Sequence, residues 1–107
     1  LDLAALLRRL PGLADAIRSI YHEANKRILS EAKLFAKLLQ NPRWLTNEEE
    51  LAAQVRLLAR LAPHWCTLVS ANDLPAVKLD PNVRFTEVQK ALKAIAAKGE
   101  LPAEGAS

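Results

Sequence analysis

The apolar residues of this 107-residue chain are dominated by leucine and alanine. The sequence holds 20 Leu and 19 Ala but only 5 Val and 4 Ile. Leucine and alanine favour helices, whereas β-branched residues favour strands, so the composition argues against an all-β fold. Half of the residues are apolar and a quarter are charged, which is the balance of a globular domain. A chain of this length is expected to form one domain with a single modest core.

The same sequence disfavours several classes of protein. No stretch approaches the roughly 18 consecutive apolar residues of a transmembrane helix, and no basic region typical of a secretory signal opens the chain, so we expect no membrane association. The single cysteine, Cys66, precludes an internal disulfide, and a reducing compartment is the default expectation. The net charge of +3 permits an acidic partner without requiring one.

Helical periodicity dominates the N-terminal part of the chain. Apolar residues recur at helical spacing over 3–24, and Pro11-Gly12 is expected to end or bend this stretch. Ile28-Leu29 could form a very short strand. Ser30 is a typical N-cap, and it predicts a helix over 30–40.

The clearest helix start in the sequence lies at Thr46. Thr46 and Glu49 have the spacing of a capping box, in which each side chain accepts a hydrogen bond from the other residue's backbone N–H. Glu48 and Glu50 add negative charge where the positive end of the helix dipole favours it. These residues predict a helix over 46–62.

Strand-like alternation appears only after that helix. It flanks Asn72-Asp73, a dipeptide typical of tight turns, and predicts a β-hairpin over 66–79. Thr86 is expected to cap a last helix. Two helices joined by a turn and followed by a hairpin indicate a mainly α winged helix, that is, a helix-turn-helix plus a β-hairpin wing, with an extra C-terminal helix. A helical bundle with a loop over 66–80 is the alternative fold.

The predicted domain organisation is simple, because no internal repeat or low-complexity tract is visible. We predict a winged-helix domain over 1–98. Residues 99–107 contain two of the three glycines and a proline, and we predict that they form a flexible C-terminal tail.

A winged helix suggests DNA binding, and the charge distribution tests that idea. In a helix-turn-helix, the N-terminal part of the second helix faces base edges in the major groove. Here that part would be Asn47-Glu48-Glu49-Glu50, whose carboxylates would oppose the electrostatic attraction that dominates DNA affinity. The wing tip from Ser70 to Val77 contains no Lys or Arg. We therefore expect no direct DNA contact.

Basic residues are instead dispersed over the predicted helices. Solvated helix faces explain most of them. Some of these basic residues lie beside an apolar stripe, and others lie one helical turn apart. A helix with an apolar stripe next to cations can dock in a groove on a partner protein. Packing of these stripes on the domain's own core is the simpler explanation. The candidate partner-binding residues are Arg8, Arg9, Arg18, Lys33, Lys37 and Arg43.

Residues suited to catalysis or cofactor binding are scarce. His64 and Cys66 would share one face of a strand, so a nucleophilic pair is conceivable, but no third group orients them and a buried structural thiol is the usual state. Two His and one Cys do not make a metal site, and a chain with three Gly lacks a glycine-rich phosphate loop. Trp65 is expected to pack in the core, and Trp44 either does the same or anchors a partner. We predict a non-enzymatic domain with no cofactor and no metal.

Three segments in register resemble a known family. They are Leu10-Pro11-Gly12-Leu13-Ala14 leading into Ile17-Arg18-Ser19-Ile20, then Leu57-Leu58-Ala59-Arg60-Leu61-Ala62-Pro63-His64-Trp65, and then Val77-Lys78-Leu79-Asp80. Their order and spacing resemble the C-terminal winged-helix domain of the DNA replication licensing factor that loads the MCM helicase and is inhibited by geminin. The resemblance runs from about Leu7 to Lys98.

The resemblance implies a nuclear, protein-binding winged helix that engages the C-terminal winged-helix region of one MCM subunit and helps to place the helicase on origin DNA. The chain departs from the family pattern in two ways. Family members tend to carry basic residues in the wing, where this chain has Ser70-Ala71-Asn72-Asp73. Part of the family's MCM-contacting helix also lies upstream of this domain, which implies weak affinity for the fragment by itself.

Two other functions stay open at the level of the sequence. The first is a DNA-binding winged helix of a transcription regulator, which would show duplex affinity that falls steeply with salt. The second is a structural or redesigned helical domain without a partner, which the absence of Met and the abundance of Ala, Leu, Lys and Glu would suit. In each case we expect the domain alone to be a monomer.

Overall fold

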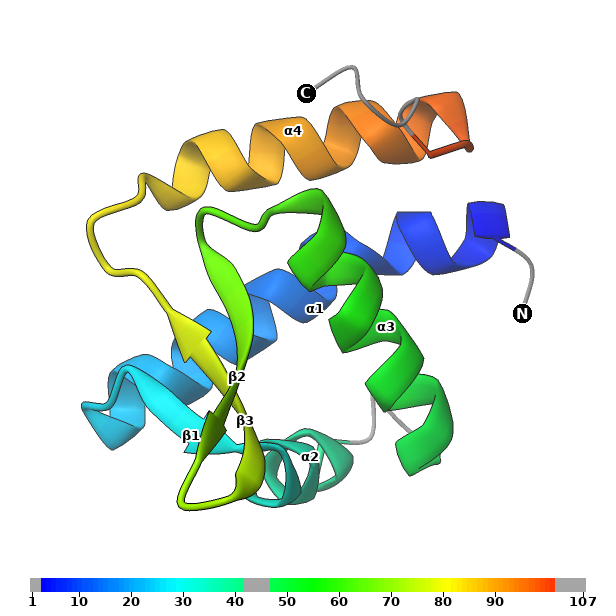
Figure 1. Cartoon of the computed structure of the whole chain (residues 1–107). Coiled ribbons are helices and arrows are strands. Elements are labelled where there is room, and N and C mark those ends of the chain that lie inside the picture. Colours follow the sequence, from blue (N-terminus) through cyan, green and yellow to red (C-terminus); the bar gives the residue numbers. More distant parts are fainter. Residues whose placement is uncertain (1–2, 42–46, 102–107) are drawn as a thin grey trace.

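The computed structural model describes residues 3–41 and 47–101. In these residues the elements are α1 (Leu3–Ala24), β1 (Ile28–Ser30), α2 (Glu31–Leu39), α3 (Glu48–Leu61), β2 (Cys66–Ala71), β3 (Leu74–Leu79) and α4 (Phe85–Lys98). The strands form one antiparallel sheet in the order β1-β3-β2. In Figure 1, α4 runs along α1, and the sheet lies beside the α2–α3 pair. This is a mainly α winged helix with the β2–β3 hairpin as its wing, so the predicted fold class is confirmed.

Residues 3–24 form one helix, although Pro11 lies inside it. The helix continues through Pro11-Gly12 instead of ending there. The reason is packing: Leu10 and Leu13, on either side, are both buried, so the apolar stripe is unbroken and outweighs the local preference of proline. The Pro11 carbonyl accepts a hydrogen bond of 2.8 Å from Nε2 of Gln89, which ties α1 to α4.

The predicted cap of α2 is confirmed, and the cap of α3 lies one residue later than expected. Ser30 accepts a hydrogen bond of 3.3 Å from the backbone N–H of Lys33. At α3 the N-cap is Asn47, not Thr46, and Thr46 itself lies outside the described residues. Oδ1 of Asn47 accepts from the backbone N–H of Glu50 at 2.8 Å. Asn is at least as favourable as Thr at an N-cap, so the helix start shifts without loss of a cap.

The predicted cap of α4 is wrong. The helix already begins at Phe85, and Arg84 occupies the N-cap position without a side-chain cap hydrogen bond. Thr86 therefore lies inside the first turn. The prediction from the capping preference of threonine failed because a tertiary contact lies at the start of the helix: the Phe85 ring packs against Trp65.

The wing turn agrees with its sequence prediction. Asn72 and Asp73 have φ angles of 54° and 63°, between the paired residues Ala71 and Leu74. Two consecutive residues with positive φ are typical of the tight two-residue hairpin turn, and Asn and Asp tolerate this conformation better than most residues.

One core unites all the elements. Its fully buried members come from α1, α2, α3 and the sheet, with Val88 and Leu92 contributed by α4. Leucine predominates, as the composition implied. Across the two described ranges, 3–41 and 47–101, no helix combines the length and the apolar character of a membrane span.

The chain after α4 still contacts the domain. Gly99 ends the helix with a φ of 70°, a left-handed conformation that glycine adopts without steric cost. Leu101 packs against the core. The predicted boundary between domain and tail at 98–99 stays a prediction.

Candidate functional site

The beginning of α3 is acidic. Glu48, Glu49 and Glu50 form its first turn, and the first two are exposed. Their charge stabilises the helix because it lies at the positive end of the helix dipole. The same negative charge repels the phosphates of DNA. The end of α3 that would enter a major groove is therefore poorly suited to binding DNA.

The wing is apolar rather than basic. Leu68 and Leu74 are 42% and 59% exposed. No Lys or Arg lies between Cys66 and Val77, and Asp73 is the one charged residue of that stretch. The first turn of α3 and the wing tip therefore offer acidic and apolar surface, which does not complement a duplex. The exposed cations of these two elements are Arg56 and Arg60 in the C-terminal half of α3 and Lys78 near the end of β3, away from the first turn of α3 and the wing tip.

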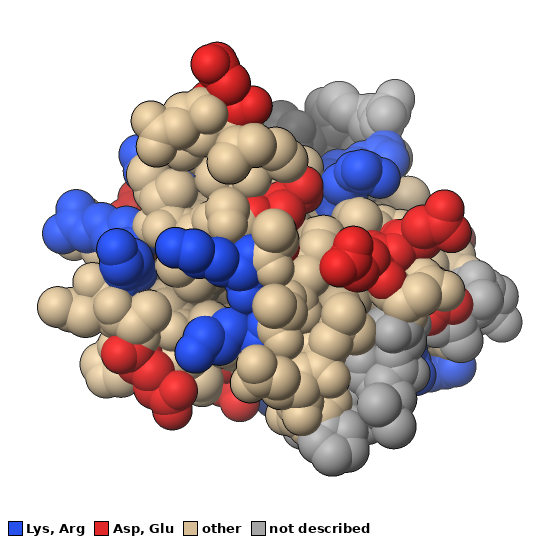
Figure 2. All heavy atoms as spheres, turned by 90° about the horizontal axis from the view of Figure 1, so that it is seen from below, with Lys and Arg blue, Asp and Glu red and all other residues tan. Residues whose placement is uncertain are grey.

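The predicted partner-binding residues are spread over several parts of the domain. Arg8 and Arg9 are exposed in the N-terminal half of α1. Lys33 and Lys37 are exposed on α2, where Lys37 borders a hollow that also holds two acidic side chains of α1. Arg43 lies outside the described residues. Figure 2 shows that basic side chains gather in the centre and on the left of the lower face, with acidic side chains around them.

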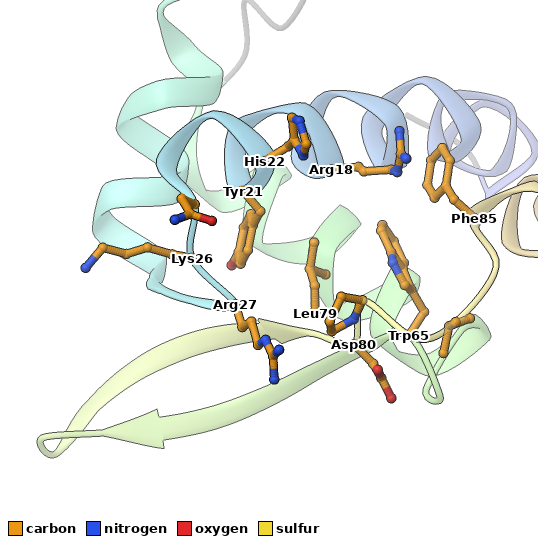
Figure 3. Close-up of a pocket in the computed structure, with 12 residues that line it drawn as sticks. Arg18, Tyr21, His22, Lys26, Arg27, Trp65, Leu79, Asp80 and Phe85 are labelled. Atoms are coloured by element: carbon orange, nitrogen blue, oxygen red, sulfur yellow. The ribbon is translucent and has the colours of Figure 1, made fainter.

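The remaining predicted residue, Arg18, lies at a groove between the C-terminal end of α1 and the segment that joins β3 to α4 (Figure 3). The groove has a volume of about 450 Å³. Its apolar wall is formed mainly by Tyr21, Trp65, Leu79 and Phe85. We call this hollow the α1 groove.

Charged residues surround the mouth of the α1 groove. Three permanent cations line it, Arg18, Lys26 and Arg27, against the single carboxylate of Asp80. Figure 3 shows Lys26, Arg27 and Asp80 extending outward, while Arg18 extends toward Phe85. The groove thus combines an aromatic interior with a net positive rim.

Aromatic contacts hold the wall of the groove in place. The rings of Trp65 and Phe85 are 5.3 Å apart between centroids and tilted by 50°, a favourable arrangement for aromatic pairs. The guanidinium carbon of Arg18 lies 4.9 Å from the Phe85 ring centroid, which is cation–π distance. The cation is therefore positioned by the wall beneath it.

Tyr21 is held in the wall by a hydrogen bond to the sheet. Its hydroxyl donates a 2.6 Å hydrogen bond to the backbone carbonyl of Val77 in the central strand. Burial raises the pKa of Tyr21 well above its ordinary value of 10.0. The neutral, hydrogen-bonded phenol is therefore the form present at physiological pH.

The backbone at the end of α1 places the rim cations. Asn25 has a φ of 53°, and Lys26 then donates its backbone N–H to the carbonyl of Tyr21 at 3.2 Å. The Arg27 carbonyl accepts from the N–H of Leu79 at 2.9 Å, which fixes this corner against β3. Lys26 and Arg27 are thus presented by an ordered turn.

The opposite rim is also ordered by its own hydrogen bonds. The N–H of Asp80 donates to the carbonyl of Trp65 at 2.9 Å. Oδ1 of Asp80 accepts from the backbone N–H of Asn82 at 2.9 Å. The carboxylate is thereby engaged with its own loop.

Sequence reasoning identified Arg18 and missed the groove to which it belongs. Lys26 and Arg27 were not among the predicted partner-binding residues, because nothing local distinguishes the rim of a groove from any other polar surface. Phe85 was not singled out either. The one available signal was its aromatic character directly before the predicted cap Thr86, next to Arg84.

The conceivable nucleophilic pair gains no support from its surroundings. Cys66 is fully buried, and burial raises the pKa of its thiol from 9.0 to about 12. A neutral thiol is a poor nucleophile. His64 is exposed in the turn between α3 and β2. In residues 3–41 and 47–101, no three His, Cys, Asp or Glu side chains are grouped so that they could hold a metal ion.

Comparison with known proteins identifies the family. Residues 2–72 match the family model of the DNA replication factor Cdt1 C-terminal domain. The chain is also 30% identical over 67 residues to CDT1-like protein b of Arabidopsis thaliana, a match that covers 61% of this chain and 14% of that relative. Both matches confirm the resemblance inferred from the three sequence segments. The chain belongs to the Cdt1 C-terminal domain family of DNA replication factors.

Proposed function

We propose that this domain binds the MCM helicase through the C-terminal winged-helix region of one of its subunits, as the interaction module of a nuclear replication licensing factor. The family is non-enzymatic, so the function of the domain lies in binding. The observation that carries the proposal is the match of residues 2–72 to the Cdt1 C-terminal domain model.

The charge distribution supports a protein partner over a duplex. The first turn of α3 holds Glu48, Glu49 and Glu50, and the wing offers exposed Leu68 and Leu74. Acidic and apolar surfaces are compatible with protein contacts, whereas duplex affinity depends on neutralising phosphates with Lys and Arg. A winged helix with this distribution is suited to docking on a protein.

We assign the contact with MCM to the exposed cations of α1 and α2. Arg8 and Arg9 lie near one end of α1, and Lys33 and Lys37 lie on α2. Arg18 and Arg43 complete the proposed set. Since the chain spans 14% of the length of the curated relative that it matches, the contact could extend into further segments of the whole protein.

A pull-down with the MCM C-terminal winged-helix region tests the proposal. Reversing Arg8 and Arg9 to Glu should weaken binding by about tenfold or more, since each exposed charge pair contributes modestly and reversal also adds repulsion. Circular dichroism should be unchanged, because both side chains are exposed. The Lys33→Glu/Lys37→Glu pair tests α2 in the same way.

The matched control reverses two exposed cations on α4, Lys90 and Lys93, by the same change in charge. Binding should survive this control. If the 107-residue chain and a longer chain that includes the upstream helix both fail to retain the MCM fragment, the proposed function is wrong. Equal losses in the α4 control would move the contact away from α1 and α2.

A further inference from the structure

We propose that the α1 groove binds an acidic peptide segment of a partner protein, with one apolar side chain inserted against the aromatic wall and carboxylates on the cationic rim. The inference rests on the proposed function in treating the domain as a protein-binding module. Beyond that function, the bound segment is acidic, carries one apolar side chain and lies in the α1 groove.

The groove offers suitable space and surface for an inserted side chain. Its volume of about 450 Å³ lies in the range of about 300–1,000 Å³ found for sites that bind small ligands. Tyr21, Trp65 and Leu79 are nearly inaccessible as whole residues, yet they border the hollow. An apolar side chain that entered would contact aromatic and aliphatic carbon, which favours its transfer from water.

The charges at the mouth of the α1 groove favour a negatively charged ligand. Arg18, Lys26 and Arg27 face one carboxylate, Asp80, whose Oδ1 is already hydrogen-bonded to the N–H of Asn82. Among the described residues, no acidic side chain forms an ion pair with these three cations. The rim therefore has unsatisfied positive charge, and a segment that carries Asp or Glu complements it.

Arg18 is the best-placed of the three cations to bind a carboxylate. Its guanidinium lies 4.9 Å from the centroid of the Phe85 ring, and a guanidinium held at a ring keeps N–H groups for a bidentate bond with a carboxylate. Phe85 itself packs on Trp65. A single ligand could thus contact the cation with an acidic residue and the wall with its apolar neighbour.

The site is already ordered before any ligand arrives. The hydroxyl of Tyr21 is bonded to Val77, and the backbone of Asp80 is bonded to Trp65. Binding a preformed groove avoids much of the ordering cost that weakens association with mobile surfaces.

A nucleic acid would fit this surface less well than an acidic peptide. Duplex binding requires a series of cations along the phosphate backbone, whereas the first turn of α3 carries Glu48 to Glu50 and the wing tip from Ser70 to Val77 has no Lys or Arg. A concave apolar wall offers nothing to a phosphate. It does offer a place for an apolar side chain.

The test is a titration of the isotope-labelled 107-residue chain with a short synthetic peptide in which Asp and Glu flank a single Phe, followed by amide and indole NMR shifts. We expect the shifts to cluster at groove residues, with the Trp65 indole and the Arg27 amide among them. The Arg18→Glu/Arg27→Glu variant should bind about tenfold or more weakly. Replacing the peptide Phe with Ser should also weaken binding.

The Lys90→Glu/Lys93→Glu variant is the matched control, because it makes the same change of charge outside the groove. It should bind the peptide normally. Shifts confined to other surfaces, no loss in the groove variant, or tighter binding of a DNA duplex to the same residues would each overturn the inference. Retention of the MCM fragment is scored separately: if the groove variant fails with the peptide and still retains MCM, the groove inference holds and the MCM contact lies elsewhere.

Discussion

Two regions of this winged helix present opposite chemistry. In one region, α3 begins with Glu48, Glu49 and Glu50, and the wing exposes Leu68 and Leu74. In the other region, the α1 groove combines an aromatic wall with three cations and one carboxylate. A DNA-binding winged helix concentrates its cations on the recognition helix and commonly on the wing. Here the first turn of the recognition helix and the wing tip carry acidic and apolar groups, and the cations Arg56 and Arg60 lie in the second half of that helix.

This difference shows that the fold alone does not determine the ligand. The backbone of the helix-turn-helix and the wing is maintained by the core, to which the surface charges contribute little. We therefore expect the choice of partner to depend on the distribution of charge over the surface of the domain. The two regions also differ in burial, because the wall of the α1 groove is part of the core whereas Leu68 and Leu74 of the wing are exposed. Substitutions in the two regions should therefore differ in their effect on stability.

The largest effect should come from removing the wall of the groove. Trp65→Ala deletes a side chain that is only 3% exposed and packs on Phe85, and it should lower the free energy of unfolding by about 3–5 kcal/mol. Leu74→Ala, at the exposed wing tip, should change it by less than about 0.5 kcal/mol. Urea unfolding measures both. Equal losses would mean that the two regions do not differ in how much they contribute to stability.

Alkaline pH should destabilise the groove region through Cys66, which directly follows Trp65. Its thiol pKa is raised from 9.0 to about 12 in the folded chain. Below pH 9 the Cys66 thiol is protonated in both the folded and the unfolded chain, and its contribution to the stability of the folded chain is fully present. Between pH 9 and 12 the unfolded chain loses the proton first, so stability falls by up to about 1.4 kcal/mol per pH unit.

Comparing the wild type with Cys66→Ala from pH 8.5 to 10 isolates this contribution, because lysine titration is common to both proteins. The variant starts less stable, since it creates a cavity, but its stability should fall less steeply with pH. Parallel slopes would show that the buried thiol is not the group responsible.

In the α3 region, one substitution should stabilise the protein. Gln54 is fully buried, and neither its Nε2 nor its Oε1 has a hydrogen-bond partner in the described structure. Replacing it with Leu, of similar size, should raise the free energy of unfolding by about 1–2 kcal/mol, because an unsatisfied buried amide is removed. Thermal and urea unfolding check the sign. A destabilised Gln54→Leu variant would indicate that the amide has a role in the folded state.

The smallest stability change concerns the acidic turn, where the change in binding is of more interest. Glu48→Lys with Glu49→Lys should lower stability by about 1 kcal/mol or less, since it places positive charge at the positive end of the helix dipole. The same variant should gain salt-sensitive affinity for duplex DNA in a mobility-shift assay. If the variant gains no affinity for duplex DNA, the acidic first turn of α3 is not the reason why the wild-type helix does not bind DNA.

Periodic and turn-forming residues made most of the fold predictable. The Leu stripes, Ser30 and Asn72-Asp73 act locally, and the structure agrees with them. The prediction failed where tertiary contacts decide: Pro11 inside α1, and the start of α4 at Phe85. The α1 groove was not predictable because Phe85 lies far along the sequence from Arg18 and Lys26, and only the tertiary fold brings it to them.

The proposed function requires that this domain select a protein partner and not a duplex. It is tested most directly by measuring the affinity of the 107-residue chain for the MCM C-terminal winged-helix region and for duplex DNA, side by side, over a salt titration. We expect measurable MCM binding that persists at physiological salt, and duplex binding that is weak even at low salt. Duplex affinity that exceeds MCM affinity and falls steeply with salt would contradict this expectation.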